Sequence, residues 1–125
     1  MIRGIRGATT VDYDDAEEIL SRTEALLLEM SRANHLNAEV MASILFTMSP
    51  DLHAAFPAEA ARRVGWQFVP VICMRELDVP QGLPKTIRVL MNAETSLSQR
   101  QVQHVYQRDA VVLREDLGDD VTLRE

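Results

Sequence analysis

The most regular alternation of apolar and polar residues in this chain lies between Asp14 and about Arg32. Apolar residues recur there at the spacing of one helical face, which Thr23 completes; they are Ile19, Leu20, Leu26, Leu27 and Met30. Glutamates and arginines occupy most other positions, and acidic residues near the beginning complement the helix dipole. The pattern predicts one long amphipathic helix with a solvated charged side.

Other segments have the β-branched and apolar content of strands and end at glycine, proline or polar residues. Four strands are predicted, from Ile2 to Thr10, Val40 to Met48, Phe68 to Met74 and Thr86 to Ala93. A fifth, short strand is predicted from Ala110 to Leu113.

Residues typical of helix ends predict two shorter helices. Pro57 begins an alanine-rich segment that stops before Gly65, and proline at the start with glycine past the end is typical of a short helix. Ser98 and Gln101 have the spacing of a capping box, which predicts a helix to about Tyr106.

The order of these elements predicts an α+β fold whose sheet needs a second covering layer. Residues 43–46 and 68–72 are apolar on both alternating sets of side chains, so both faces of the sheet should be buried. Two helices can cover one face. Another copy of the chain in a closed symmetric ring is the simplest cover for the other, and self-association is therefore expected.

Length and composition fit one domain over residues 1–114 and a mobile acidic tail over residues 115–125. No stretch approaches the ~20 apolar residues of a membrane helix, and the beginning lacks the features of a signal peptide. A single cysteine, Cys73, cannot form an internal disulfide, which agrees with a cytoplasmic protein. The net charge of −6 argues against nucleic acid and anionic membranes as partners.

All but one of the 13 cationic side chains are arginines, the exception being Lys85. Arginine forks bind carboxylates in bidentate fashion, although compositional bias or heat adaptation also explains the surplus as a whole. Arg88 stands out because it lies within the apolar segment 86–91, where an unpaired ion is costly. Its sequence context favours a ligand role and a structural role equally, the latter with solvent or a carboxylate such as Glu76 as partner.

The remaining polar candidates each have an ordinary structural interpretation. Arg6 fits a surface position, Tyr106 a half-buried helix-end aromatic and Cys73 a small core residue. The sequence has no Gly-rich phosphate loop, no metal-spaced His or Cys cluster and no G-x-S-x-G elbow. A reaction that needs neither nucleophile, metal nor cofactor fits such a chain better than hydrolysis or redox chemistry.

Several sequence blocks match one known family in register from Met1 to about Arg114. They are Ile2-Arg3-Gly4-Ile5-Arg6-Gly7-Ala8-Thr9-Thr10, Pro50-Asp51-Leu52-His53-Ala54, Phe56-Pro57-Ala58, Gly65-Trp66-Gln67, Val69-Pro70-Val71, Cys73-Met74, Ile87-Arg88-Val89, His104-Val105-Tyr106 and Ala110-Val111-Val112-Leu113-Arg114. Through these blocks the chain resembles the monofunctional chorismate mutases of the trimeric α/β-barrel class. The resemblance is specific because the order and the spacing of the blocks agree together.

The resemblance implies a ferredoxin-like α+β subunit with a mixed sheet and helices on one face. Three subunits would form a homotrimeric pseudo α/β-barrel with active-site clefts between them. The implied activity is the isomerisation of chorismate, a small dicarboxylate, to prephenate in phenylalanine and tyrosine biosynthesis, with no cofactor and no metal.

The resemblance also assigns roles by position. Arg88 would donate to the ether oxygen, on which negative charge grows as the C–O bond breaks, and would so stabilise the transition state. Arg6 would hold a carboxylate, Tyr106 would hydrogen-bond the other end of the dianion, and Glu76 with Cys73 would contact the ring hydroxyl. Together these groups would hold the substrate in its reactive, folded conformer.

Further residues would form the walls and the entrance of the cleft. Phe56, Ala58, Val71, Ile72 and Leu113 would line the walls, with Arg62 and Arg114 near the entrance. The chain departs from the family pattern at Glu59, where many relatives carry a lysine, and just before Gly65, where it looks one residue shorter.

Two other classes of protein remain alternatives from the sequence. A trimeric deaminase of imines or a metabolite-binding module would also place an arginine in an interfacial cleft, but an imine hydrolase needs one arginine and a positioned water. A dicarboxylate mutase needs Arg6 and Arg88 together. A purely structural oligomer predicts that a protein carboxylate neutralises Arg88 in every subunit, so the number of cations in one cleft discriminates between these readings.

Overall fold

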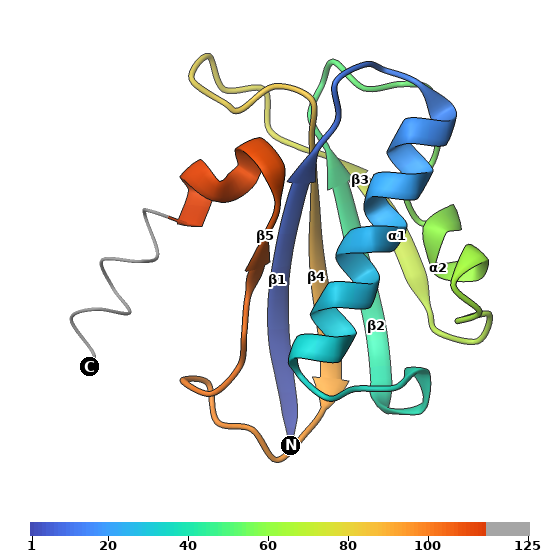
Figure 1. Cartoon of the computed structure of the whole chain (residues 1–125), viewed down its shortest axis with the longest axis vertical. Coiled ribbons are helices and arrows are strands. Elements are labelled where there is room, and N and C mark those ends of the chain that lie inside the picture. The colour runs from blue at the N-terminus through green and yellow to red at the C-terminus, as the bar shows by residue number, and fades with distance from the viewer. Residues whose placement is uncertain (115–125) are drawn as a thin grey trace.

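The computed structural model describes residues 1–114, and the predicted mobile tail at 115–125 lies outside the described residues. Within that part of the chain, five strands form one sheet in the order β3-β2-β4-β1-β5 (Figure 1). The strands are β1 (Ile2–Thr10), β2 (Met41–Met48), β3 (Val71–Arg75), β4 (Thr86–Glu94) and β5 (Val105–Tyr106). The sheet is mixed, because β4 runs antiparallel to β1 and β2 while the pairs β2/β3 and β1/β5 are parallel.

The long helix predicted from the apolar spacing is α1 (Ala16–Ala33), and all the residues predicted for its inner face are buried. Asp15 caps its beginning, since the carboxylate accepts the Glu18 N–H at 2.9 Å. Glu18 in turn accepts the Asp12 N–H at 2.7 Å. These bonds fix the connection between β1 and α1.

Close packing of α1 on the sheet depends on Gly7 in the middle of β1. A Cβ atom at this position would lie 3.2 Å from Leu26 Cδ1 and would overlap the Met30 side chain. The missing side chain therefore lets the apolar face of α1 approach the strand directly.

Besides the helical residues 111–114 at the end of the described chain, three shorter helical segments follow α1. They are α2 (Glu59–Arg63) and the 3₁₀ helices η1 (Ala38–Val40) and η2 (Arg108–Ala110). Gly65 follows α2 with a φ of 91°, a conformation that favours glycine and explains why the helix stops there. Among residues 1–114, no helix has the length and apolar content needed to cross a bilayer.

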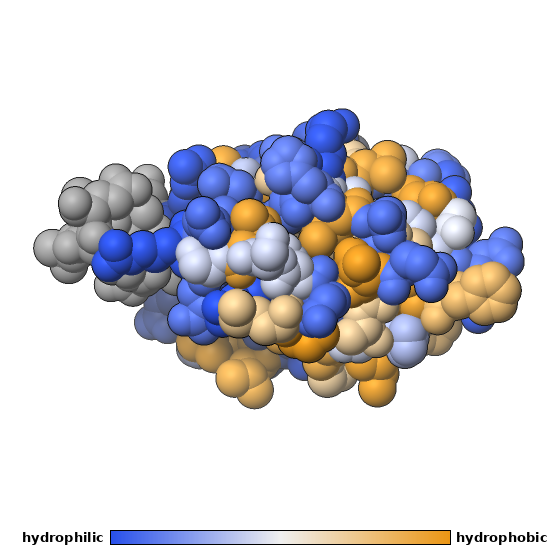
Figure 2. Space-filling model, turned by 90° about the horizontal axis from the view of Figure 1, so that it is seen from below, coloured by the Kyte–Doolittle hydropathy of each residue, from blue (hydrophilic) through white to orange (hydrophobic). Residues whose placement is uncertain are grey.

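The two faces of the sheet have different surroundings. On β4, the side chains of Ile87, Val89 and Met91 are buried in the layer between the sheet and α1, which crosses the sheet in Figure 1. The alternate side chains form what we call the open face: Arg6, Leu45, Thr47, Ile72, Met74, Arg88 and Leu90. Apolar residues reach the surface along the lower side of the view from the N-terminal end (Figure 2). The prediction of helices on one face is thus confirmed.

Two predicted elements at the end of the chain are wrong. Residues 98–104 form a turn and extended chain rather than a helix, and residues 110–113 are helical rather than a strand. Both capping-box bonds between Ser98 and Gln101 do form, at 2.9 and 3.3 Å, but they close a single turn. Beyond it the chain is extended because Val102 and Val105 fill the core beside β1.

The predicted ferredoxin-like connection of the strands is also wrong, although the α+β class is right. A ferredoxin-like chain follows the order β-α-β-β-α-β. Here α2 lies between β2 and β3, so these strands pair in parallel through a crossover, and β4 then returns between β2 and β1. The other predicted helices and strands are confirmed to within about three residues.

Asn34 ties the end of α1 to the segment that leads into β5. The residue is 1% exposed. The amide donates to Met30 O at 2.8 Å and to Gln103 O at 2.9 Å, and its oxygen accepts the Gln103 N–H at 2.7 Å. These bonds satisfy both backbone groups of Gln103 and so fix the chain just before Tyr106.

We expect Asn34→Ala to lower the free energy of unfolding by about 2 kcal/mol, because it leaves three backbone groups, two of them partly buried, without their side-chain partner. Urea unfolding at one fixed chain concentration measures the change. Asn37→Ala is the matched control: Asn37 is exposed and caps only η1, so a loss below about 1 kcal/mol is expected there. If both variants lost the same free energy of unfolding, the hydrogen bonds of Asn34 would not have this stabilising role.

Candidate active site

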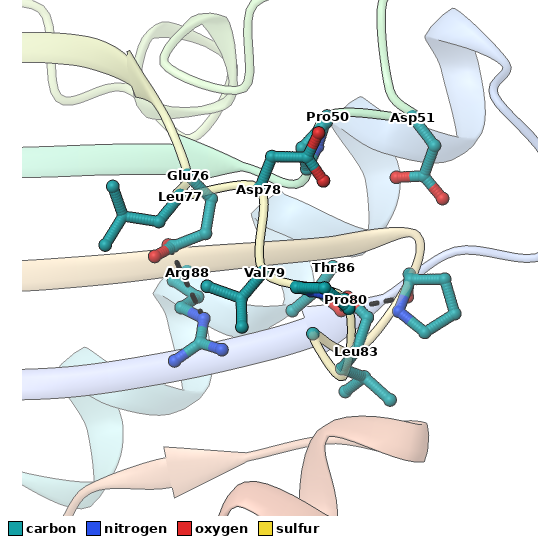
Figure 3. Close-up of a pocket in the computed structure, with 12 residues that line it drawn as sticks. Pro50, Asp51, Glu76, Leu77, Asp78, Val79, Pro80, Leu83, Thr86 and Arg88 are labelled. Carbon is teal, nitrogen blue, oxygen red and sulfur yellow. Dashed lines mark hydrogen bonds and ion pairs between the residues drawn. The ribbon is translucent and has the colours of Figure 1, made fainter.

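Arg88 lies on the open face of β4, next to Glu76 at the end of β3. The Arg88 Nε atom is 3.5 Å from Glu76 Oε1, and the two side chains are 42% and 31% exposed (Figure 3). The Nε atom is buried and has no hydrogen-bond partner among residues 1–114. The carboxylate predicted as a partner of Arg88 is therefore present. It faces only the Nε atom of the guanidinium, at a distance longer than that of a charge-assisted hydrogen bond.

A hollow of about 220 Å³ lies on the side of Arg88 toward β1 and β5. Its polar lining comes from Arg6, Arg88 and Tyr106, and Leu113 closes one side. The strand register explains this convergence, since Ala8 pairs with both Arg88 and Tyr106 and its small side chain leaves space between them. Arg6 precedes Ala8 by two residues and so lies on the same face. Arg114, at the last described position, is exposed and does not line this hollow.

Tyr106 is a neutral hydrogen-bonding group in this hollow. Burial raises the pKa of its phenol, while the charges of Arg6 and Arg88 act in the opposite direction. All three side chains line the same hollow. At neutral pH the phenol keeps its proton and can donate a hydrogen bond to an anion.

His104 fixes the backbone of Arg6, which sequence reasoning did not detect. The Arg6 N–H donates to His104 Nδ1 at 2.9 Å. An imidazole nitrogen that accepts a hydrogen bond is unprotonated, so a neutral ring holds the middle of β1 against the segment before β5.

On the other side of Arg88 the chain from Glu76 to Thr86 encloses a second hollow, of about 370 Å³ (Figure 3). Asp51 anchors it: its carboxylate accepts the Lys85 N–H at 3.0 Å and the Ser49 hydroxyl at 2.5 Å. Burial raises the pKa of Asp51, but the bonds from Ser49 and Lys85 outweigh it and lower the pKa overall. The residue just before β4 is thereby fixed, three positions before Arg88. The sequence singled out neither Asp51 nor Ser49 for this task, because both look like ordinary loop residues.

A separate group of predicted site residues surrounds α2 and the edge strand β3. Phe56, Ala58, Arg62, Val71, Ile72 and Cys73 line a hollow of about 620 Å³. Burial raises the pKa of the Cys73 thiol, which therefore stays protonated at neutral pH. Phe56 and Ile72 are 69% and 57% exposed, although both are large and apolar.

Within one chain these two groups of residues do not meet. Cys73 pairs with the buried Phe46 and lies on the helix-covered side of the sheet, whereas Arg88 lies on the open face. Glu76 and Cys73 therefore point to different faces. One chain brings together Arg6, Glu76, Arg88, Tyr106 and Leu113, and it places the α2 and β3 group elsewhere.

Comparisons with known proteins identify relatives along almost the whole chain. The family model for chorismate mutase type I matches residues 2–117. The chain is 53% identical to chorismate mutase AroH of Bacillus subtilis over 119 residues, which cover 94% of each protein. It is 50% identical to chorismate mutase AroH of Thermus thermophilus over 118 residues, or 94% of this chain and 97% of the relative.

A solved structure of a chorismate mutase from Clostridium thermocellum superimposes with a TM-score of 0.87 at 46% identity. The match covers 88% of this chain and 98% of that one. With sequence and fold in agreement over nearly its full length, the chain belongs to the chorismate mutase type I family.

Proposed function

We propose that this protein is a chorismate mutase, an isomerase that converts chorismate to prephenate for phenylalanine and tyrosine biosynthesis. The observation that carries the proposal is the convergence of Arg6, Arg88 and Tyr106 on one hollow in a member of this family. Two guanidiniums and a phenol match the two carboxylates and the ether oxygen of the substrate.

The reaction needs stabilisation of charge and restriction of shape rather than a nucleophile. As the C–O bond breaks and the C–C bond forms, negative charge grows on the ether oxygen, and the guanidinium of Arg88 stabilises it. Arg6 binds a carboxylate of the substrate, and Tyr106 donates a hydrogen bond to the other end of the dianion. Glu76 accepts a hydrogen bond from the ring hydroxyl. An acceleration of ~10⁶-fold requires that the transition state be bound about 8 kcal/mol more tightly than the substrate. A fixed cation and a restricted conformer can supply this difference.

The geometry favours this function over the alternatives that the sequence left open. An imine hydrolase needs one arginine and a positioned water, whereas two arginines line the same hollow here. A purely structural role for Arg88 calls for full pairing with a carboxylate. The contact to Glu76 involves Nε at 3.5 Å, while the terminal nitrogens of Arg88 point away from Glu76 in Figure 3.

We further propose that the protein is a homotrimer with its active sites between subunits. This assembly is supported by the exposed apolar side chains of the open face and by the division of the site residues into two groups. The group of Arg6, Glu76, Arg88 and Tyr106 from one chain meets the walls formed by Phe56, Ala58, Val71, Ile72 and Cys73 of the next chain. Arg62 and Arg114 then lie at the entrance, where Glu59 takes the place of a cation.

Replacing Arg88 tests the catalytic proposal. We expect Arg88→Ala to lower kcat/KM for chorismate by ~10³-fold or more, because both the charge and the donors to the ether oxygen are lost. Loss of chorismate absorbance in metal-free buffer measures the rate. Arg32→Ala, at the exposed end of α1, is the matched control and should keep the wild-type rate. A wild-type protein no faster than the spontaneous reaction would contradict the proposal.

Mixing two inactive variants tests the shared site. Arg88→Ala removes the cation, and Cys73→Asp places a like charge beside the dianion, so each variant alone should be inactive. After joint refolding in equal amounts, about one quarter of the clefts should be intact if each cleft combines Arg88 of one chain with Cys73 of another. Light scattering should report a mass of about three chains. Absence of recovered activity from a properly assembled mixture would show that one chain supplies both groups.

A further inference from the structure

The ion pair between Arg88 and Glu76 is loose for two charged side chains that touch. Its Nε to Oε1 distance is 3.5 Å, whereas charge-assisted hydrogen bonds of this kind measure about 2.7–2.9 Å. Arginine and carboxylate groups generally prefer the paired arrangement with two parallel hydrogen bonds. A specific contact must therefore hold Glu76 away from that arrangement.

Thr47 provides this contact. Its hydroxyl donates a hydrogen bond to Glu76 Oε1 at 2.6 Å, so the same oxygen faces both Thr47 and Arg88. Thr47 of β2 pairs with Arg88 of β4 in the sheet register, and both side chains lie on the open face. A β-branched side chain in a strand has few accessible rotamers, which makes its hydroxyl a rigid anchor.

The backbone of Glu76 is fixed as well. Its N–H donates to Met48 O at 2.9 Å, which extends the pairing of β3 with β2 by one residue. The carboxylate is thus held at both ends, by the strand and by the Thr47 hydroxyl. Rotation of the Glu76 side chain away from Thr47 would bring its carboxylate toward the terminal nitrogens of Arg88.

We propose that Thr47 is a positioning residue that keeps the Arg88 guanidinium available for substrate. Its hydroxyl retains the Glu76 carboxylate on the Nε side, and the two terminal nitrogens remain directed away from Glu76 (Figure 3). This inference rests on the proposed function, because it concerns binding of a dicarboxylate at Arg88.

Loss of the hydroxyl has a defined consequence. Glu76 can then rotate and form two parallel hydrogen bonds with Arg88, and a substrate oxygen has to displace it. Such competition weakens the binding of ground state and transition state alike, so KM rises more than kcat falls. General damage to the fold is not expected to raise KM more than it lowers kcat.

The first test replaces Thr47 with valine, which keeps the branched shape and removes the donor. We expect Thr47→Val to lower kcat/KM about tenfold, mainly through KM, and Thr47→Ser to restore it to within about threefold. Thr9→Val is the matched control, because Thr9 is buried on β1 and its hydroxyl has no hydrogen-bond partner among the described residues. A kcat/KM of Thr47→Val within twofold of wild type would overturn the proposal.

The second test shows whether Thr47 acts through Glu76. Calorimetry would measure the affinity for prephenate in wild type, Thr47→Val, Glu76→Gln and the double variant. We expect about a tenfold loss from Thr47→Val in the wild-type background and less than about twofold in Glu76→Gln, where no carboxylate competes. If Thr47→Val lost the same affinity for prephenate in the wild-type and the Glu76→Gln background, Thr47 would have a merely structural role.

Two further outcomes separate this inference from the function on which it rests. An about tenfold loss of affinity from Thr47→Val in a Glu76→Gln protein that still binds prephenate would contradict competition at Arg88 and leave the proposed function standing. A wild-type protein that neither converts chorismate nor binds prephenate would overturn the proposed function itself, and this inference with it.

Discussion

The site depends on a guanidinium that is held in an apolar sheet and is only partly paired. Arg88 has apolar neighbours before and after it on β4, and its buried Nε atom meets a single carboxylate at 3.5 Å. Burial of this Nε atom is costly for the folded chain alone, because desolvation is repaid only by good pairing, but the side chain as a whole is 42% exposed and the cost is partial. In the proposed mutase the substrate dianion completes that pairing. The partly paired cation therefore favours the binding of an anion.

The fold supports this arrangement with contacts away from the reacting atoms. The Ala8 register places Tyr106 and Arg88 on either side of one small residue. Asn34 and His104 fix the strands that carry Tyr106 and Arg6, and Asp51 fixes the start of β4. These bonds orient the site because each satisfies backbone groups within a strand or just before one, and alternate side chains of these strands face the hollow.

Sequence patterns predicted the elements with strong periodicity and failed where tertiary contacts decide. The apolar spacing of α1 and the β-branched content of β1, β2 and β4 are local signals, and all four elements are confirmed. The capping box at Ser98 is also local, but burial of Val102 and Val105 beside β1 overrides it. Resemblance to a family assigned the site residues. It could not show that one chain separates Cys73 from Arg88, since strand pairing decides which face each residue occupies.

A crystal structure with prephenate bound would test the central claim most directly. The account predicts that the carboxylates of prephenate contact Arg6 and Arg88 of one chain while Phe56 and Cys73 of a neighbouring chain form the wall of the same cleft. Prephenate bound by a single chain, or with Arg88 still turned toward Glu76 and no contact to the ligand, would contradict it.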